Sequence, residues 1–208
     1  MASLSEGIDN MRIEELHPSI YCSWMVGHGK FARMGVQGDG SCFFHSVCAM
    51  TNRKGYIHKT PPQQKDIAYE FRCDFGKKFT AEEYKRLSKP DSKSEGEYAD
   101  GFCSPKVWAD EFMINIVSKA LNLNLIFLDL RNGKAYCGVH GQETLDKEIP
   151  KQNTGIVAWV DHRHFEPIVR IDDAEKGIIT TLFSPSTSKE DAKIVRKIMD
   201  KYSKGCAI

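Results

Sequence analysis

A cysteine follows a glycine-rich turn at residues 38–42, where the chain reads "GDGSC" and continues as "FFHSV". The apolar positions after Ser41 predict a buried helix that ends near Thr51 and Asn52. Cys42 would then lie at a helix N-terminus, where free backbone N–H groups and the positive end of the helix dipole stabilise a thiolate. The same N–H groups could hold the oxyanion of a tetrahedral intermediate. Cys42 is therefore a candidate nucleophile.

A thiolate needs a base, and His164 is the best-placed histidine. It begins an expected strand, 164–171, and Glu166 follows two residues later. Alternate residues of a strand share a face, so an orienting acid could stand beside the base. Asp39, three residues before Cys42, is a second candidate for that acid. His45 lies on the Cys42 helix, and we expect it to pack or to help place the turn.

The order of the elements predicts an α+β fold, because helices come first and a mostly antiparallel sheet comes later. We expect helices at 41–52, 61–79, from 80, at 104–124 and at 187–203. Strands are expected at 31–36, 125–130, 134–139, 155–160, 164–171 and 177–183. The polar segment 88–104 is expected to be a long loop, which is typical of functional or mobile regions.

Composition excludes several classes of protein. Twenty-nine basic residues against 28 acidic ones give a net charge of +1, so the chain lacks the basic excess that is typical of nucleic-acid-binding proteins. No apolar run is long enough for a membrane span, and the first residues do not form a secretory signal. The seven cysteines are scattered, with no paired spacing, so we expect neither structural zinc nor disulfides. Reduced thiols indicate a cytoplasmic or nuclear protein.

Three blocks of sequence resemble the ovarian-tumour (OTU) domain cysteine proteases. "GDGSCFFHS" resembles the family's D-G-x-C block, and "HFEPI" resembles its block around the catalytic histidine. Between them, "VWADEFMINIVSKALNLNLIFLDL" is similar to the family's middle segment, in which a helix leads into a central strand. The resemblance covers roughly Met34 to Ile171, and the compact size and "CFFHS" are similar to viral members.

The resemblance implies a papain-like OTU fold and deubiquitination, which is cleavage of the isopeptide bond after the C-terminal Gly-Gly of ubiquitin. It implies that Cys42 is the nucleophile and His164 the general base and then the acid. Glu166 stands where the family usually has Asp or Asn. Asp39 would shape the turn or support the histidine, so the third catalytic role stays open between these two residues.

The resemblance also assigns substrate contacts and domain limits. Gly40 and the neighbouring amides, with Ser41, would form the oxyanion hole, and Trp108 would lie beside the substrate tail. Carboxylates of the 88–104 segment could meet the arginines of that tail. The catalytic domain would be 31–172, preceded by an extension, 1–30, and followed by a strand and helix packed on the domain, 173–208. The implied protein is a monomer without a cofactor, and its partner is ubiquitin or polyubiquitin.

Three alternatives remain open from the sequence. The chain could process a ubiquitin-like modifier, or it could be another papain-like peptidase or acyltransferase. It could also be a non-catalytic ubiquitin-binding module, although an intact cysteine, histidine and acid argue against that. A ubiquitin probe with a C-terminal electrophile would separate these possibilities.

Overall fold

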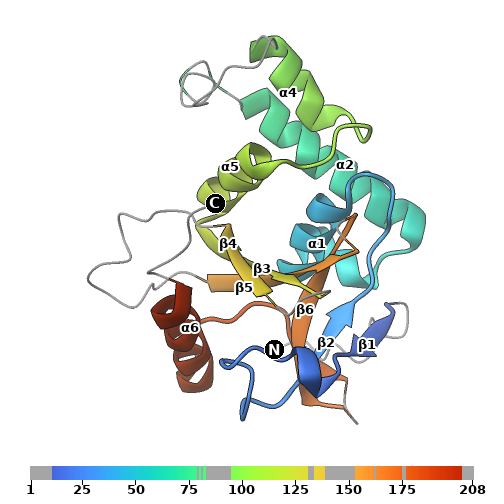
Figure 1. Ribbon diagram of the computed structural model, residues 1–208. Coiled ribbons are helices and arrows are strands. Elements are labelled where there is room, and N and C mark those ends of the chain that lie inside the picture. The colour runs from blue at the N-terminus through green and yellow to red at the C-terminus, as the bar shows by residue number, and fades with distance from the viewer. Residues whose placement is uncertain are drawn as a thin grey trace.

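The computed structural model describes residues 11–78, 80, 82, 95–130, 134–138, 153–161, 163–174 and 177–202. Its centre is a seven-stranded sheet in the order β1-β2-β6-β5-β3-β4, with β7 paired to β6. Figure 1 shows helices on both sides of this sheet. The strands are β1 Ile13–Glu15, β2 Lys30–Met34, β3 Leu123–Asp129, β4 Lys134–Gly138, β5 Asn153–Val160, β6 His164–Asp173 and β7 Ile178–Thr180.

The α+β prediction with a mostly antiparallel sheet is confirmed. β3 and β5 are parallel, whereas every other strand pair among the described residues is antiparallel. Side chains alternate across the sheet, so Leu125 and Phe127 of β3 enter one apolar cluster and Ile126 and Leu128 enter the other. A sheet covered on both faces needs apolar residues at successive positions, which explains the continuous "LIFL" run.

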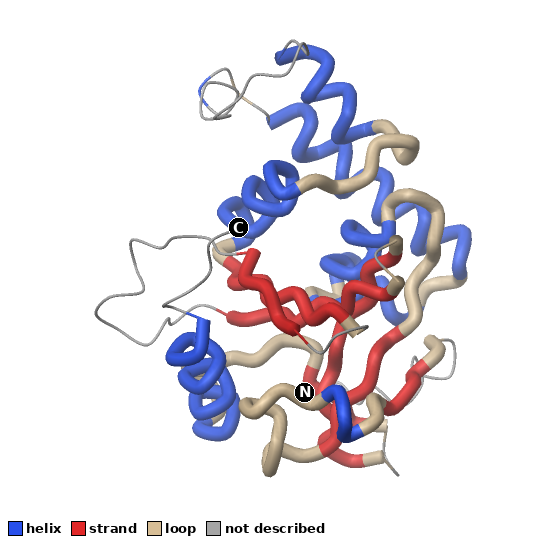
Figure 2. Tube along the Cα trace, viewed as in Figure 1, coloured by secondary structure: helices blue, strands red, loops and turns tan. Residues whose placement is uncertain are grey.

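The helices are α1 Cys42–Met50, α2 Pro61–Lys78, α4 Glu95–Cys103, α5 Glu111–Leu121 and α6 Lys189–Tyr202, with short 3₁₀ segments η3 Pro18–Ile20 and η4 Arg53–His58. Figure 2 shows these helices in blue around the red strands. The apolar cluster that holds Phe44, Phe71, Phe102 and Val117 joins α1, α2, α4 and α5. Among the described residues, no helix is long and apolar enough to cross a membrane.

Two predicted elements were wrong between residues 88 and 124. Part of the expected loop is α4, because Tyr98 and Phe102, one helical turn apart, bury one side of a polar segment. The next helix begins later than expected, at Glu111, because Asp110 and not Ser104 caps it: the Asp110 carboxylate accepts a hydrogen bond from Met113 N. Most of the helix expected from residue 80 lies outside the described residues, and so does Asp91, one of the carboxylates of the 88–104 segment.

The expectation of reduced thiols is wrong for one pair, since a disulfide joins Cys73 of α2 to Cys103 of α4. Sequence spacing could not reveal it, because the two residues meet only when the two helices pack side by side, with Cα atoms 4.4 Å apart. At Gly76 the helices approach so closely that an added Cβ would lie 2.6 Å from Ala99 O.

The terminal segments belong to the same core. Leu16, Trp24 and Met25 are buried within the expected N-terminal extension, and β1 pairs with β2, so residues 11–30 are part of the domain. At the other end, Ile194 and Val195 of α6 are buried in the cluster beneath the second face of the sheet.

Candidate active site

Cys42 is the first residue of α1, as the sequence predicted, and its side chain is half-buried. The remaining residues of this helix, Phe43 to Met50, are all buried, which explains why the helix continues directly from the turn. The Ser46 hydroxyl is 2.8 Å from Cys42 O and 3.0 Å from Phe165 O. Ser46 therefore ties the first turn of α1 to β6, the strand that carries His164.

His164 lies between the thiol and a buried acid. Its ring lies beside the Cys42 side chain, and its Nε2 is 3.5 Å from Glu166 Oε1. These two contacts, that with Cys42 being the stronger, raise the pKa of His164 to about 9, against a smaller opposing effect of burial. The structure thus brings Cys42, His164 and Glu166 together, from α1 and from alternate positions of β6.

Glu166 is held by arginines from the N-terminal part of the chain. Its side chain is 3% exposed, and a buried carboxylate needs partners. Arg12 Nη2 donates a hydrogen bond of 3.4 Å to Oε1. Arg33 Nη1 is 3.4 Å from Oε2, which is ion-pair distance, but its direction does not make a hydrogen bond. Sequence reasoning missed both arginines, which reach the site only through the pairing of β1, β2 and β6.

Asp39 lies against His45, not against His164. Its Oδ1 accepts a hydrogen bond from Ser41 N at 3.1 Å and is 3.2 Å from His45 Nε2. His45 Nδ1 is in turn 2.6 Å from the Tyr56 hydroxyl. Burial lowers the pKa of His45 despite the raising effect of Asp39, so the ring is neutral. Asp39 therefore shapes the turn, whereas the acid beside His164 is Glu166.

The turn before Cys42 can only contain glycine at position 40. Gly40 has φ +83°, and an added Cβ would lie 2.0 Å from Pro105 O. The N–H of Ser41 is occupied by Asp39. Within the described chain, no acceptor is paired with the N–H of Gly40 or Cys42, so these two groups, and not that of Ser41, are free to face an oxyanion.

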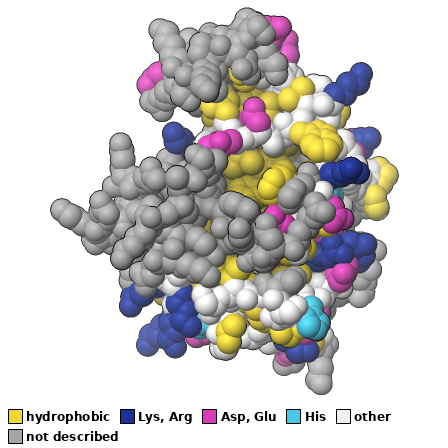
Figure 3. Space-filling view, viewed as in Figure 1, with side chains coloured by type: hydrophobic (Ala, Val, Ile, Leu, Met, Phe, Trp, Pro, Cys, Tyr) yellow, Lys and Arg dark blue, Asp and Glu magenta, His cyan; other side chains and the backbone are white. Residues whose placement is uncertain are grey.

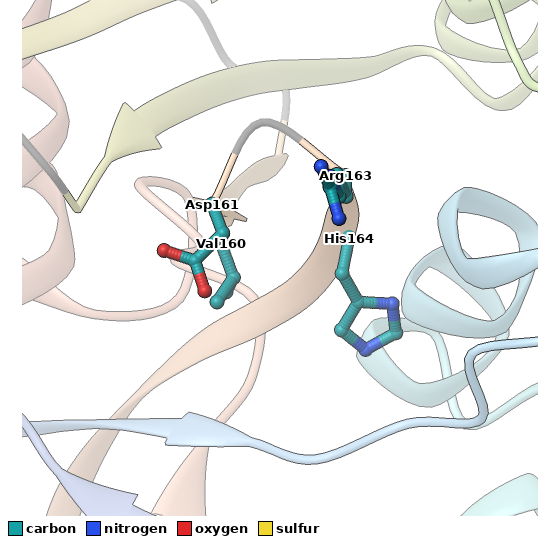
Figure 4. Close-up of a pocket in the computed structure, with 4 residues that line it drawn as sticks. All are labelled: Val160, Asp161, Arg163 and His164. Atoms are coloured by element: carbon teal, nitrogen blue, oxygen red, sulfur yellow. The ribbon is translucent and has the colours of Figure 1, made fainter.

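Trp108 is 59% exposed and lies two residues before Asp110, the N-cap of α5. An open pocket of about 430 Å³ lies beside the base and is lined by Val160, Asp161, Arg163 and His164. In Figure 4 the His164 ring and the Asp161 carboxylate point away from one another. His162 and His164 form an H-x-H sequence that could ligate a metal, but His162 lies outside the described residues. No group of three or more metal-ligating side chains occurs among those described.

A further residue near the turn is Arg72 of α2, which sequence reasoning also missed. The sequence did carry a signal for Arg72. The buried side of α2 is formed by residues 64, 67, 68, 71, 72 and 75, and Arg72 places a charge on this otherwise uncharged side. Arg72 is fully buried and donates hydrogen bonds to Gly40 O and Ser41 Oγ.

The arrangement supports acyl transfer. A thiol at a helix N-terminus touches a histidine that stays protonated to high pH, and an acid orients that histidine. Protonated imidazole stabilises a neighbouring thiolate and can later protonate a leaving amine.

Comparison with models of protein families finds no match, and no curated protein sequence matches. Solved structures do match. An ovarian tumour (OTU) domain in complex with ubiquitin has a TM-score of 0.55 and 15% identity, covering 86% of this chain and 91% of that one. The OTU domain of OTUD1 (TM-score 0.49, 15% identity, 66% and 85% covered) and the Hazara virus OTU bound to ubiquitin (0.42, 14%, 76% and 87%) are also similar. Taken with the sheet order and the position of Cys42, the first of these comparisons shows that the chain has the OTU-domain fold.

Proposed function

We propose that this protein is a deubiquitinating cysteine protease that hydrolyses the isopeptide bond after the C-terminal Gly-Gly of ubiquitin. The observation that carries the proposal is the position of His164, which contacts Cys42 on one side and the buried Glu166 on the other. A purely structural cysteine and histidine would not need a buried carboxylate held by two arginines.

The reaction follows from the positions of the groups. The Cys42 thiolate attacks the glycine carbonyl, and the N–H groups of Gly40 and Cys42 stabilise the oxyanion. The protonated His164 gives its proton to the leaving lysine amine, which leaves an acyl-enzyme. His164 then accepts a proton from water, which attacks the thioester and releases the ubiquitin carboxylate. Glu166 keeps the ring in place throughout.

The fold supports ubiquitin as the substrate in this proposal. The OTU domain with the TM-score of 0.55 is itself in complex with ubiquitin. Figure 3 shows hydrophobic side chains gathered in the centre of one face, with acidic side chains at their margin, which suits a protein substrate.

The decisive experiment is incubation with ubiquitin that carries a C-terminal electrophile. Wild type should gain the mass of one ubiquitin, Cys42→Ala should gain none, and Cys48→Ala should react like wild type because Cys48 is buried in the same helix. Iodoacetamide labelling of Cys42 in parallel shows whether the thiol is reactive.

A reactive thiol without a ubiquitin adduct would contradict the proposal. Repeating the assay with probes built on ubiquitin-like modifiers would then identify a different modifier. An unreactive Cys42 in folded protein would favour a binding module instead.

A further inference from the structure

Within the described residues, the charged side chain of Arg72 reaches the nucleophile turn, residues 38–41, from the core side through hydrogen bonds to Gly40 O and Ser41 Oγ. Its side chain is 0% exposed, and its guanidinium lies 4.7 Å from the centre of the Phe44 ring, two residues after Cys42. Within that same part of the chain, no carboxylate forms an ion pair with it. A buried cation without a counter-ion is costly, so its hydrogen bonds must compensate.

All five of those hydrogen bonds go to two segments of the chain. Nη1 donates to Gly40 O at 3.3 Å and to Ser41 Oγ at 3.0 Å, both in the nucleophile turn. Nη2 donates to Gly101 O at 3.1 Å and to Val107 O at 2.7 Å, and Nε donates to Phe102 O. One guanidinium therefore joins the turn that presents Cys42 to the connection between α4 and α5.

These two segments would repel one another without a cation between them. Four carbonyl oxygens, of Gly40, Gly101, Phe102 and Val107, converge on one point, and Pro105 O presses against Gly40. Only a planar group with five N–H donors in a fork can satisfy such a set at once. Burial lowers the pKa of Arg72 to about 10, so it remains charged at neutral pH.

We propose that Arg72 is a positioning residue that sets the distance between the Cys42 turn and the segment carrying Trp108, and so holds the thiol against His164. Val107, one of its acceptors, directly precedes Trp108, so the guanidinium joins both sides of the approach to the nucleophile. This inference rests on the proposed role of Cys42 as a nucleophile and not on the identity of the substrate.

The test uses the reactivity of Cys42 with iodoacetamide, which needs no ubiquitin. The alkylation rate of Cys42 is measured at pH 6 and at pH 9 in wild type and in each variant. Arg72→Lys keeps the positive charge but loses the forked N–H donors of the guanidinium, so the nucleophile turn can shift. We expect the ratio of the alkylation rates at pH 6 and pH 9 to fall at least tenfold. A displacement on the order of 1 Å should lower kcat by about 100-fold.

Arg170→Lys is the matched control. Arg170 has only 11% of its side chain exposed and forks to Asp172 and Asp191, on the part of β6 away from the site. The Arg170→Lys variant should lose about as much stability as Arg72→Lys and should keep the wild-type ratio of alkylation rates. Ser41→Ala is a milder second variant, because it removes a single acceptor of Arg72, and it should lower the ratio several-fold.

The outcomes separate the two proposals. If Arg72→Lys and Ser41→Ala both keep the wild-type ratio, Arg72 only stabilises the fold and the inference is overturned. If Arg72→Lys does not fold, Ser41→Ala decides alone by the same criterion. If the ratio of alkylation rates falls in the variants but the wild-type protein does not react with ubiquitin probes, the role of Arg72 is supported and deubiquitination is refuted.

Discussion

Replacing Cys42 by Ala should lower the pKa of His164 substantially. The contact with Cys42 is the largest cause that raises this pKa from an ordinary value of 6.5 to about 9, and the contact with Glu166 is the second. The full shift corresponds to roughly 3 kcal/mol in favour of the protonated ring, and screening at a ring that is 24% exposed makes this an upper bound. Removing the thiol should bring the pKa down towards 6.5.

Proton NMR of the His164 ring, with the resonance assigned by a His164→Gln variant, measures this directly. Wild type should titrate near pH 9, Cys42→Ala well below it, and Cys42→Ala combined with Glu166→Gln lower still. The sign follows from the charges: a thiolate or a carboxylate favours the charged ring. The activity of wild type should accordingly decline as the pH rises through about 9, when His164 loses the proton that the leaving amine needs.

Two results would refute this reasoning. A wild-type ring that titrates near pH 6.5 would mean that Cys42 and His164 do not interact in solution. A pKa that stays near 9 in Cys42→Ala would assign the shift to Glu166 alone, and the thiol would then have no part in it.

Three further changes test other parts of the site and of the fold. Glu166→Gln keeps the shape of the side chain but removes the charge that orients His164, so kcat/KM should fall by a factor on the order of 100 with little change in KM. An unchanged rate would mean that another acid orients His164. Gly40→Ala should cost about 1–3 kcal/mol in urea unfolding and abolish activity, because its Cβ would lie 2.0 Å from Pro105 O; wild-type stability would contradict the turn geometry. Reduction should raise the number of thiols titrated in denatured protein by two, from the Cys73–Cys103 disulfide, and Cys73→Ser should show no such increase.

The disulfide should also stabilise the α2–α4 pair. Its ends are 30 residues apart in sequence, which corresponds to roughly 3–4 kcal/mol of chain entropy in the unfolded state. Urea unfolding with and without reductant measures this contribution. Equal midpoints under both conditions would show that the covalent link adds nothing to the packing of the two helices.

The sequence by itself determined the features that depend on neighbouring residues. A glycine turn followed by a buried helix placed Cys42 at a helix N-terminus, and the period of two along a strand placed Glu166 beside His164. These relations hold within one element, so spacing predicts them. The α+β class followed from the order of the elements in the same way.

Local pattern failed where packing decides conformation. The segment 95–103 is polar, and propensity alone favours a loop there, but burial of Tyr98 and Phe102 against α2 makes it a helix. The free energy that stabilises α4 comes from a contact with a distant element, and a marginal short helix depends on such contacts.

Only the tertiary structure decided which groups surround the candidate catalytic residues. Asp39 is three residues from Cys42, yet its carboxylate lies against His45, because the turn folds back over α1. Arg33 of β2 reaches Glu166, and Arg72 of α2 reaches the Cys42 turn. Each arginine lies far in sequence from the group that it contacts. Ion pairs and hydrogen bonds act over a few ångströms in space, and sequence spacing carries no information about distances between elements that only the packed core brings together.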